Sequence, residues 1–278
     1  MTKDHTLLVE GVTLGYGDRT VVQDLDLALP PGRITCIVGA NACGKSTLLR
    51  AMARLLPARS GRIVLDGRSV HSTPTREIAR TLGLLPQSPV APEGIAVADL
   101  VARGRNPHQK VFARSSPRDD AAVAEALRVT DTLPLADRSV DELSGGQRQR
   151  VWIAMALAQQ TDVLLLDEPT TYLDVCHQVE VLDLLTDLNR DRGTTIAMVL
   201  HDLNLAARYA DHLVAVRSGR LHAAGDPADV LTAQTVREVF GMASQVVPDP
   251  VSGRPMVLPV GRHHCAPRTP SRSTTSSP

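Results

Sequence analysis

The sequence predicts an α/β protein whose core is a mixed β-sheet. From residue 161 onward, short apolar β-rich runs alternate with segments of helical spacing, which is typical of parallel strands joined by crossover helices. Before residue 88 the segments are mainly strand-like, and between 88 and 160 they are helical with no evident strand. We therefore expect one α/β core with an N-terminal antiparallel β-subdomain and an inserted all-helical subdomain.

The N-terminal part alternates strand signals with turn signals. A Pro-Pro-Gly turn at 30–32 and an Asp-Gly hairpin signal at 66–67 separate its apolar runs, and Pro86 stops the last one. The predicted strands are LLVEGVTLGY (7–16), VVQDLDLAL (21–29), RITCIVG (33–39), RIVLDG (62–67) and TLGLLPQ (81–87). One helix interrupts them, STLLRAMARLL at 46–56, directly after a glycine-rich loop.

The remaining elements follow from the same periodicities. Predicted helices in the insertion are AVADLVARG (96–104), PRDDAAVAEALRV (117–129) and SGGQRQRVWIAMALAQ (144–159). Two strand–helix units come next, TDVLLLDEP (161–169) with a helix at 175–191, and TTIAMVLHD (194–202) with a helix at 203–211. A hairpin around Ser218-Gly219 completes the pattern.

These segments define the expected domain organisation. One domain spans 1–262, with its core at about 1–87 and 161–262 and its helical subdomain at about 88–160. The Ser/Thr/Pro-rich stretch 263–278 has little to bury, so we expect a disordered tail.

Composition excludes several classes of function. Lys+Arg and Asp+Glu both number 30, so net charge gives no general attraction to nucleic acid, and no nucleic-acid partner is expected. The four cysteines form no CxxC pair, which argues against a zinc site and favours reduced thiols in the cytosol. The N-terminus lacks a secretory signal and no apolar run has membrane-spanning length, so any membrane role is expected to go through a partner.

The segment GANACGKS at 39–46 fits G-x-x-x-x-G-K-[ST] between a strand and a helix. Its two glycines allow successive backbone N–H groups to converge on phosphate oxygens, and the positive end of the following helix points at the same place. Lys45 is one of three lysines in an otherwise arginine-using chain, which fits a need for a compact ammonium at the terminal phosphates. The expected nucleotide-binding residues of this loop are Gly39, Ala40, Asn41, Ala42, Cys43, Gly44, Lys45, Ser46 and Thr47.

Two adjacent carboxylates end the apolar run VLLLDEP at 163–169. Successive strand residues point to opposite sides, so Asp167 and Glu168 should have different roles. We expect Asp167, together with the Ser46 hydroxyl, to hold Mg²⁺, and Glu168 to accept a hydrogen bond from the attacking water. Solvated carboxylates at a turn are the alternative, which the nearby glycine loop disfavours.

Three more side chains are candidates by position. His201 ends another strand of the same kind and could donate to the γ-phosphate, although a lone His is more often structural. Gln87 follows Leu-Leu-Pro and could reach the metal or the water. Tyr16 is one of six aromatic residues and could stack on adenine, with core packing as the alternative.

A second anion site is predicted at LSGGQRQR, 143–150. Ser144 can cap a helix that begins at Gly145, leaving helix N–H groups open to a phosphate. This site lacks its own lysine and carboxylates, so it could serve the same nucleotide or that of a partner chain. The residues alone leave that choice open.

The ordered motifs GANACGKST, LPQ, LSGGQRQR, VLLLDEPTTYLD and VLHDLN resemble those of the ATP-binding subunit of ABC transporters over residues 6–250. The resemblance implies a P-loop NTPase core and ATP hydrolysis with Mg²⁺. It also implies a head-to-tail dimer of two copies, in which LSGGQ of one chain faces the P-loop of the other. Asp174 stands in the D-loop position at that interface. The nucleotide-binding residues implied outside the P-loop are Tyr16, Ser144, Gly145, Gly146, Gln147 and Asp174.

Within this family, the segments DLVARGRNPHQ and LLLDEPTTYLDVCHQVEVLDLL look most like those of ferric-siderophore importers. Importers of cobalamin, haem or metal are similar, and a non-transport ABC ATPase or an exporter subunit are the other readings. An importer implies polytopic permease partners, an indirect link to a substrate-binding protein and a peripheral place on the cytoplasmic face of the membrane. The Arg-rich stretch Arg103, Arg105, His108, Lys110 and Arg114 could face the permease or lipid headgroups, or be a solvated helical face.

Overall fold

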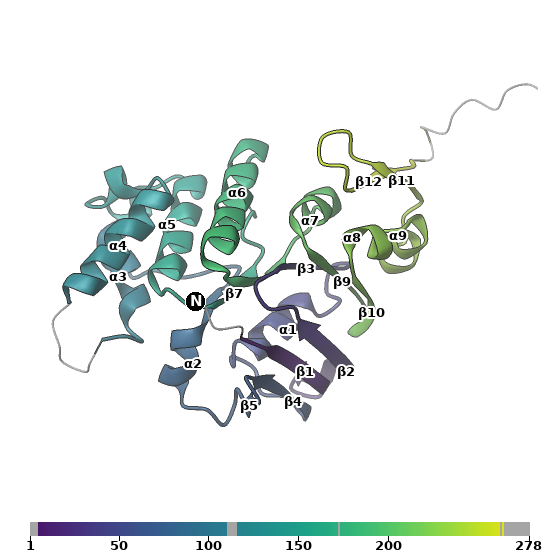
Figure 1. Ribbon diagram of the computed structural model, residues 1–278, viewed down its shortest axis with the longest axis horizontal. Helices are drawn as coiled ribbons and strands as arrows, with labels where there is room; N and C mark the ends of the chain where they lie inside the picture. Colours follow the sequence, from purple (N-terminus) through teal and green to yellow (C-terminus); the bar gives the residue numbers. More distant parts are fainter. Residues whose placement is uncertain (1–4, 110–115, 172, 262, 264–278) are drawn as a thin grey trace, which may run out of the picture.

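The computed structural model describes residues 5–109, 116–171, 173–261 and residue 263, and it confirms the α/β fold (Figure 1). Six strands form the central sheet in the order β10-β9-β3-β8-β7-β6. Five of them are parallel and β10 is antiparallel to β9, so the sheet is mixed, as expected. The strands are β3 Ile34–Val38, β6 Leu82–Leu85, β7 Val163–Asp167, β8 Thr195–Val199, β9 His212–Arg217 and β10 Arg220–Gly225.

A second, antiparallel sheet is built by the N-terminal part of the chain in the order β2-β1-β4-β5. Its strands are β1 Leu7–Tyr16, β2 Arg19–Leu29, β4 Ser60–Leu65 and β5 Arg68–Ser69. Helix α1, Lys45–Met52, lies between this sheet and the central one and buries apolar side chains against both. The glycine loop that precedes α1 is therefore supported from two directions.

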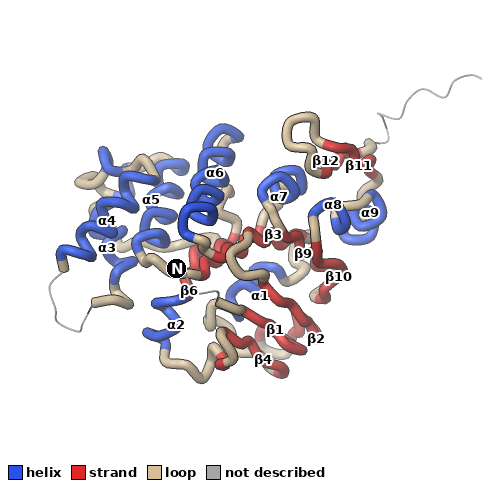
Figure 2. Tube along the Cα trace, in the orientation of Figure 1, coloured by secondary structure: helices blue, strands red, loops and turns tan. Residues whose placement is uncertain are grey.

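The insertion is helical, as predicted. Its helices are α3 Val97–Ala102, α4 Pro117–Val129 and α5 Gly145–Ala158, with 3-10 turns at Arg103–Arg105, Leu133–Leu135 and Val140–Glu142. In the described part of 88–160 the only extended pairing is an isolated bridge between Ala96 and Ser139. Figure 2 shows these helices gathered at one end of the molecule, beside α6 (Val175–Arg192) and away from the antiparallel sheet.

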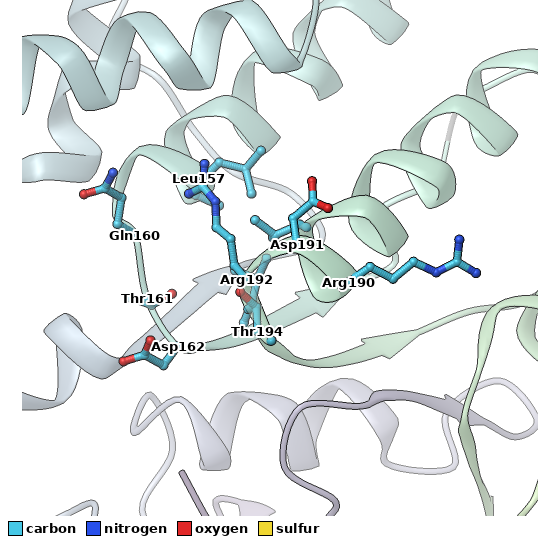
Figure 3. A pocket seen from close by; sticks show the side chains of 12 residues that line it. Leu157, Gln160, Thr161, Asp162, Arg190, Asp191, Arg192 and Thr194 are labelled. Carbon is cyan, nitrogen blue, oxygen red and sulfur yellow. The ribbon is translucent and has the colours of Figure 1, made fainter. Parts of the chain in front are cut away.

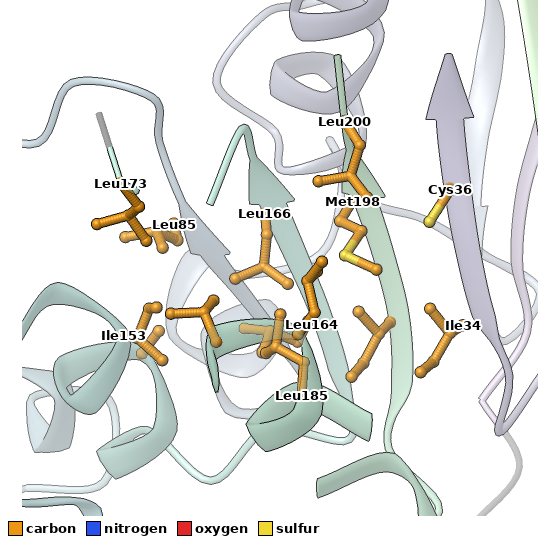
Figure 4. Packing of buried hydrophobic residues seen from close by; sticks show 14 of the residues in the cluster. Ile34, Cys36, Leu85, Ile153, Leu164, Leu166, Leu173, Leu185, Met198 and Leu200 are labelled. Atoms are coloured by element: carbon orange, nitrogen blue, oxygen red, sulfur yellow. The ribbon is translucent and has the colours of Figure 1, made fainter. Parts of the chain in front are cut away.

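The central sheet is buried on both faces because successive strand residues alternate between two apolar clusters. Leu164 and Leu166 of β7 face one cluster, while Val163 and Leu165 face the other. Figure 4 shows the first cluster, in which Leu164, Leu166 and Met198 of the strands meet Ile153 of α5 and Leu185 of α6. Burial on both faces explains why these strands are continuous apolar runs rather than alternating ones.

The helix predicted over 46–56 is shorter than expected. It ends at Met52, and two residues later Arg54 adopts a left-handed φ of 66°, which an α-helix cannot include. The Arg54 guanidinium donates to Thr75 Oγ1 at 2.7 Å and to the carbonyl of His71. These contacts explain why the chain leaves the helix there.

Several elements had no counterpart in the sequence predictions. They are α2 Thr75–Thr81, α8 Pro227–Val230, α9 Ala233–Phe240, β11 Ser244–Pro248 and β12 Pro255–Pro259. Helix α9 carried a readable signal, since Thr232 caps its start and Gly241 ends it with a left-handed φ of 69°. The β11–β12 hairpin did not, because its two five-residue strands contain three prolines, and proline is depleted in strands.

The suggestion that Arg105 belongs to a surface patch is wrong. Its side chain is 2% exposed and donates from Nε to Asp119 Oδ1 at 2.9 Å and from Nη1 to the carbonyl of Ala158 at 2.7 Å. Hydrogen bonds from Ser116 and Arg105 hold the pKa of Asp119 below its usual range. Arg105 thus fastens the start of α4 to the end of α5. Lys110 and Arg114 of the suggested patch lie outside the described residues.

Among the helices of the described residues, none combines the length and the apolar character of a membrane span. The predicted disordered tail, 263–278, falls outside the described residues except for His263.

The buried pair predicts a large effect on stability. Arg105→Met should lower the free energy of unfolding by about 3 kcal/mol, because Asp119 remains buried without its cation. Arg103→Met is the matched control, since Arg103 is exposed on the same turn and should change stability by less than about 0.5 kcal/mol. Urea unfolding measures both, and adding Asp119→Leu to Arg105→Met should restore part of the loss. Equal stability of the two single variants would contradict this assignment.

Candidate functional site

A pocket of about 610 Å³ lies where the carboxyl ends of the central strands meet the antiparallel sheet. In open α/β sheets, ligands bind at this edge. Its lining residues are Tyr16, Arg19, Val21, Asn41, Ala42, Cys43, Gly44, Lys45, Ser46, Thr47, Gln87, Glu168 and His201. Most of the residues that we expected one chain to contribute to a nucleotide site are thus brought together in one place.

A second pocket of similar size, about 640 Å³, lies elsewhere (Figure 3). Gln160, Thr161 and Asp162 line it immediately before β7, and Arg190 to Thr194 line it immediately before β8. It therefore opens at the amino ends of the strands, at the edge opposite the glycine loop. It has no glycine loop of its own, so we take the first pocket as the candidate site.

The glycines of the loop are required by close contacts. A Cβ on Gly39, whose φ is 157°, would lie 2.3 Å from the carbonyl oxygen of Val216 in β9. A Cβ on Gly44, whose φ is 106°, would lie 2.9 Å from Val22 of β2. The loop is thus held between the two sheets with no room for a larger residue at either position.

Lys45 is already positioned by the loop that carries it. The side chain is 5% exposed, and its Nζ donates to the carbonyl of Gly39 at 2.9 Å and to that of Ala40 at 3.0 Å. Gly39 and Ala40 therefore do not line the pocket but fix the ammonium group at its floor. An anion entering the loop would replace these carbonyl oxygens as the acceptor for the Lys45 ammonium group.

Ser46 and Asp167 lie in contact although they are 121 positions apart, with Ser46 Oγ donating to Asp167 Oδ1 at 2.9 Å. Burial raises the pKa of Asp167, the hydrogen bond from Ser46 opposes the rise, and the neighbouring Glu168 adds to it. Two oxygen ligands of the kind that Mg²⁺ prefers are thus adjacent at the end of β7. A cation bound there would favour the ionised carboxylate.

Glu168 sits in the turn after β7 and not in the strand, because its φ is 56°. We expected Asp167 and Glu168 to differ because successive strand residues point to opposite sides. That reason is wrong, since Glu168 is not in the strand. The left-handed turn instead aims the Glu168 carboxylate at the pocket, where it is 7% exposed. Its conformation is uncommon for a residue other than glycine, and such strained positions cluster at functional sites.

Three side chains surround the carboxylate of Glu168. Gln87 Nε2 donates to Oε2 at 2.7 Å, and Thr171 Oγ1 donates to the same oxygen at 3.0 Å. His201 Nε2 lies 2.5 Å from Oε1. Gln87 and His201 were expected near the site on separate grounds, and the structure brings both to Glu168 itself.

Tyr16 is 46% exposed and lines the pocket, so the alternative of core packing is wrong. Stacking on adenine stays a prediction. Arg19, beside it in the lining, was not anticipated because nothing distinguishes it in sequence from the chain's other arginines.

The predicted cap at Ser144 is present. Helix α5 starts at Gly145, Ser144 Oγ accepts from the N–H of Gln147 at 3.3 Å, and Gln147 Oε1 accepts from the N–H of Ser144 at 3.1 Å. The pocket lining does not include the residues from Ser144 to Gln147, and it does not include Asp174. Asp174 caps α6 instead, and hydrogen bonds from the backbone and the ring of His177 hold its pKa below the usual range.

Two further residues around Glu168 escaped the sequence predictions. Thr171 contacts the carboxylate directly, and Gln149 Nε2 donates to the carbonyl of Pro169 at 2.8 Å. Thr171 lies within the quoted motif VLLLDEPTTYLD, so its place was readable but its contact was not. Gln149 lies 20 positions from its acceptor, and no pattern signals that pairing.

Comparison with known proteins decides the family. Residues 22–171 match the ABC transporter family. The chain belongs to the ATP-binding subunits of ABC transporters. This ABC ATPase is 54% identical over 251 residues to the achromobactin transport ATP-binding protein CbrD of Dickeya dadantii (strain 3937), covering 90% of this chain and 93% of that protein. It is 50% identical over 253 residues to the ferric enterobactin transport ATP-binding protein FepC of Escherichia coli (strain K12), covering 91% and 93%.

Solved structures agree with the fold of this ABC ATPase. A metal-chelate type ABC transporter in an inward-facing conformation superposes with a TM-score of 0.81 at 28% identity, over 94% of this chain and 99% of that one. The dimeric ATP-binding cassette MJ0796, bound to ADP and Pi after hydrolysis, gives a TM-score of 0.70 at 25% identity, over 79% and 98%.

The contacts of Gly39 give a test of the loop geometry. Gly39→Ala should lower the free energy of unfolding by about 2 kcal/mol or more, because the methyl group would collide with the Val216 carbonyl. Gly145→Ala is the control, since a Cβ there meets nothing within 4 Å, and it should change stability by less than about 0.5 kcal/mol. Thermal unfolding of the two variants and the wild type measures the difference, and an unchanged melting temperature for Gly39→Ala would show that the loop is not packed as described.

Proposed function

We propose that this ABC ATPase hydrolyses ATP at the pocket described above and thereby drives the import of a ferric siderophore through separate permease chains. The observation that carries the catalytic part is the convergence of four segments that are distant in sequence. Ser46 of the loop contacts Asp167, and Gln87 and His201 contact Glu168. Together these segments supply the kinds of group that transfer of a phosphoryl group to water requires, namely metal ligands, a general base and hydrogen-bonding side chains.

Binding of ATP would begin at the glycine loop. Its backbone N–H groups and the amino end of α1 favour phosphate oxygens, and Lys45 would exchange the carbonyls of Gly39 and Ala40 for the terminal phosphates. Ser46 and Asp167 would hold Mg²⁺, with Gln87 approaching from its side of the pocket. The ion would neutralise charge on the phosphates. Tyr16 would offer its exposed ring to the adenine.

Hydrolysis would depend on Glu168 as the general base. Its carboxylate is held by Gln87 and Thr171 at one oxygen and by His201 at the other, so it is oriented before water arrives. To donate to the γ-phosphate, His201 would turn its Nε2–H away from Glu168.

The second anion site would act on the nucleotide of a partner chain. This site lies outside the pocket that holds the P-loop of the same chain, which supports its binding to the partner chain's nucleotide. Its residues are Ser144, Gly145, Gly146 and Gln147. The similar cassette MJ0796 is dimeric. We propose a head-to-tail dimer of two copies, with Asp174 at the same interface.

The proposed cargo rests on the relatives. Proteins at 54% and 50% identity, matched over nine-tenths of the chain, are the achromobactin and ferric enterobactin transport ATPases named above. Haem and cobalamin import ATPases match at the lower identities of 42% and 39%, which favours a siderophore over haem or cobalamin as the cargo. A permease, and through it a substrate-binding protein, would place the chain on the cytoplasmic face of the membrane.

Glu168→Gln tests the catalytic and the transport roles together. The variant should keep its fold and its ATP binding but lose ATP turnover by about 10²–10⁴-fold, because an amide cannot accept the proton. In cells lacking the gene, wild-type protein should restore uptake of radioactive ferric siderophore, while Glu168→Gln should not. Phosphate release and iron uptake are the measurements. Near-normal turnover would contradict the role of Glu168, and restoration of haem or cobalamin uptake alone would contradict the cargo.

A mixed dimer tests whether Ser144 acts in trans. Lys45→Ala removes the loop ammonium, and Ser144→Arg blocks the helix end with a bulky side chain. Either variant alone forms dimers in which both sites are damaged. If Ser144 serves the partner's nucleotide, a dimer with one copy of each variant has one doubly damaged site and one intact site, so ATP hydrolysis should partly recover on mixing.

Recovery would be measured as phosphate release and as nucleotide trapped per verified mixed dimer. If Ser144 served its own chain's nucleotide, every site would carry one lesion in every mixture. Mixed dimers that neither trap nucleotide nor hydrolyse it would therefore rule out action in trans.

A further inference from the structure

One hydrogen bond links helix α5 to the turn that carries Glu168. Gln149, in the second turn of α5, donates from Nε2 to the carbonyl oxygen of Pro169 at 2.8 Å. Pro169 is buried and directly follows Glu168 in sequence. The bond thus joins the helix that Ser144 caps to the peptide between Pro169 and Thr170, one residue after the proposed base.

This turn needs support from its surroundings. Glu168 has a φ of 56°, a left-handed conformation that is unfavourable for a residue with a Cβ. Within the turn, the N–H of Thr171 donates to the Glu168 carbonyl at 3.2 Å, and the Thr171 hydroxyl donates to its carboxylate. Gln149 adds a hydrogen bond from a different element, helix α5. Its acceptor is the carbonyl of Pro169, the residue that follows Glu168.

The amino end of α5 also packs against the segment after the turn. A Cβ built on Gly146 would lie 3.6 Å from Leu173 and 4.0 Å from the ring of His177. Gly146 thus faces Leu173 of the loop between β7 and α6 and His177 in the first turn of α6, with room for a methyl group between them. A shift of α5 would be transmitted to the Pro169 carbonyl.

We infer that Gln149 is a positioning residue for Glu168. Its amide fixes the Pro169 peptide, keeps the left-handed turn in place and so holds the Glu168 carboxylate in line for water, while tying that carboxylate to the helix that Ser144 caps. The inference rests on the proposed role of Glu168 as the base. It predicts that loss of the amide donor slows the chemical step and leaves ATP binding intact.

The test compares Gln149→Met with Gln159→Met. Gln159 makes the same kind of bond from the other end of α5, where its Nε2 donates to the carbonyl of Ala79 at 2.6 Å, and it does not line the pocket. Gln149→Met should lower kcat about 10-fold with KM for ATP within about twofold, the size expected when one hydrogen bond is lost. Gln159→Met should keep kcat within about twofold.

Two further variants separate positioning from loss of structure. Gln149→Lys keeps a donor on a flexible stem and should recover most of kcat. Adding Gln149→Met to Glu168→Gln should lower the residual rate by less than about twofold, because the group being positioned is already absent. A wild-type kcat in Gln149→Met, a raised KM with unchanged kcat, or full additivity with Glu168→Gln would each overturn the inference. Near-normal activity of Glu168→Gln would instead contradict the proposed function beneath it.

Discussion

The parallel pairing of β3, β8 and β7 is the constraint on which the site depends. Strands that run in the same direction end at the same edge, and in this sheet the ends belong to residues far apart in the chain. The Ser46–Asp167 hydrogen bond, across 121 positions, is a direct product of that pairing. Slippage of β7 by one residue would reverse the faces of Leu164 and Leu165 and move Asp167 away from the loop, so burial on both faces also fixes the register of the chemistry.

Much of this arrangement could be predicted from the sequence, because it depends on local signals. The strand, glycine loop and helix around Lys45 occur in an order that defines a phosphate site, and the apolar run before Asp167 defines a buried strand end. Ser144 followed by Gly145 and, three residues on, Gln147 is a capping pattern that the structure reproduces. The family itself followed from the order of five such motifs.

What the sequence could not supply are contacts between segments that have no shared pattern. Nothing local marks Arg105 as buried or pairs it with Asp119, since most arginines are exposed. Nothing marks Gln149 as a donor to Pro169, and the left-handed turn at Glu168 contradicts the simple alternation of a strand. These features depend on how α4, α5 and the loop after β7 pack together, which periodicity does not determine.

The cap at Ser144 also sets the polarity of its hydroxyl. A serine hydroxyl has one proton to donate and two lone pairs to accept with. In α5 the oxygen already accepts from the N–H of Gln147, and the Gln147 side chain in turn engages the N–H of Ser144. The hydroxyl therefore keeps its proton and one lone pair for an incoming ligand, and the N–H groups of the first turn, which have no partner within the helix, add further donors beside it. The end of α5 can therefore discriminate by hydrogen-bond direction as well as by charge: it favours a ligand rich in acceptor oxygens and disfavours an ammonium or amide donor of the same size.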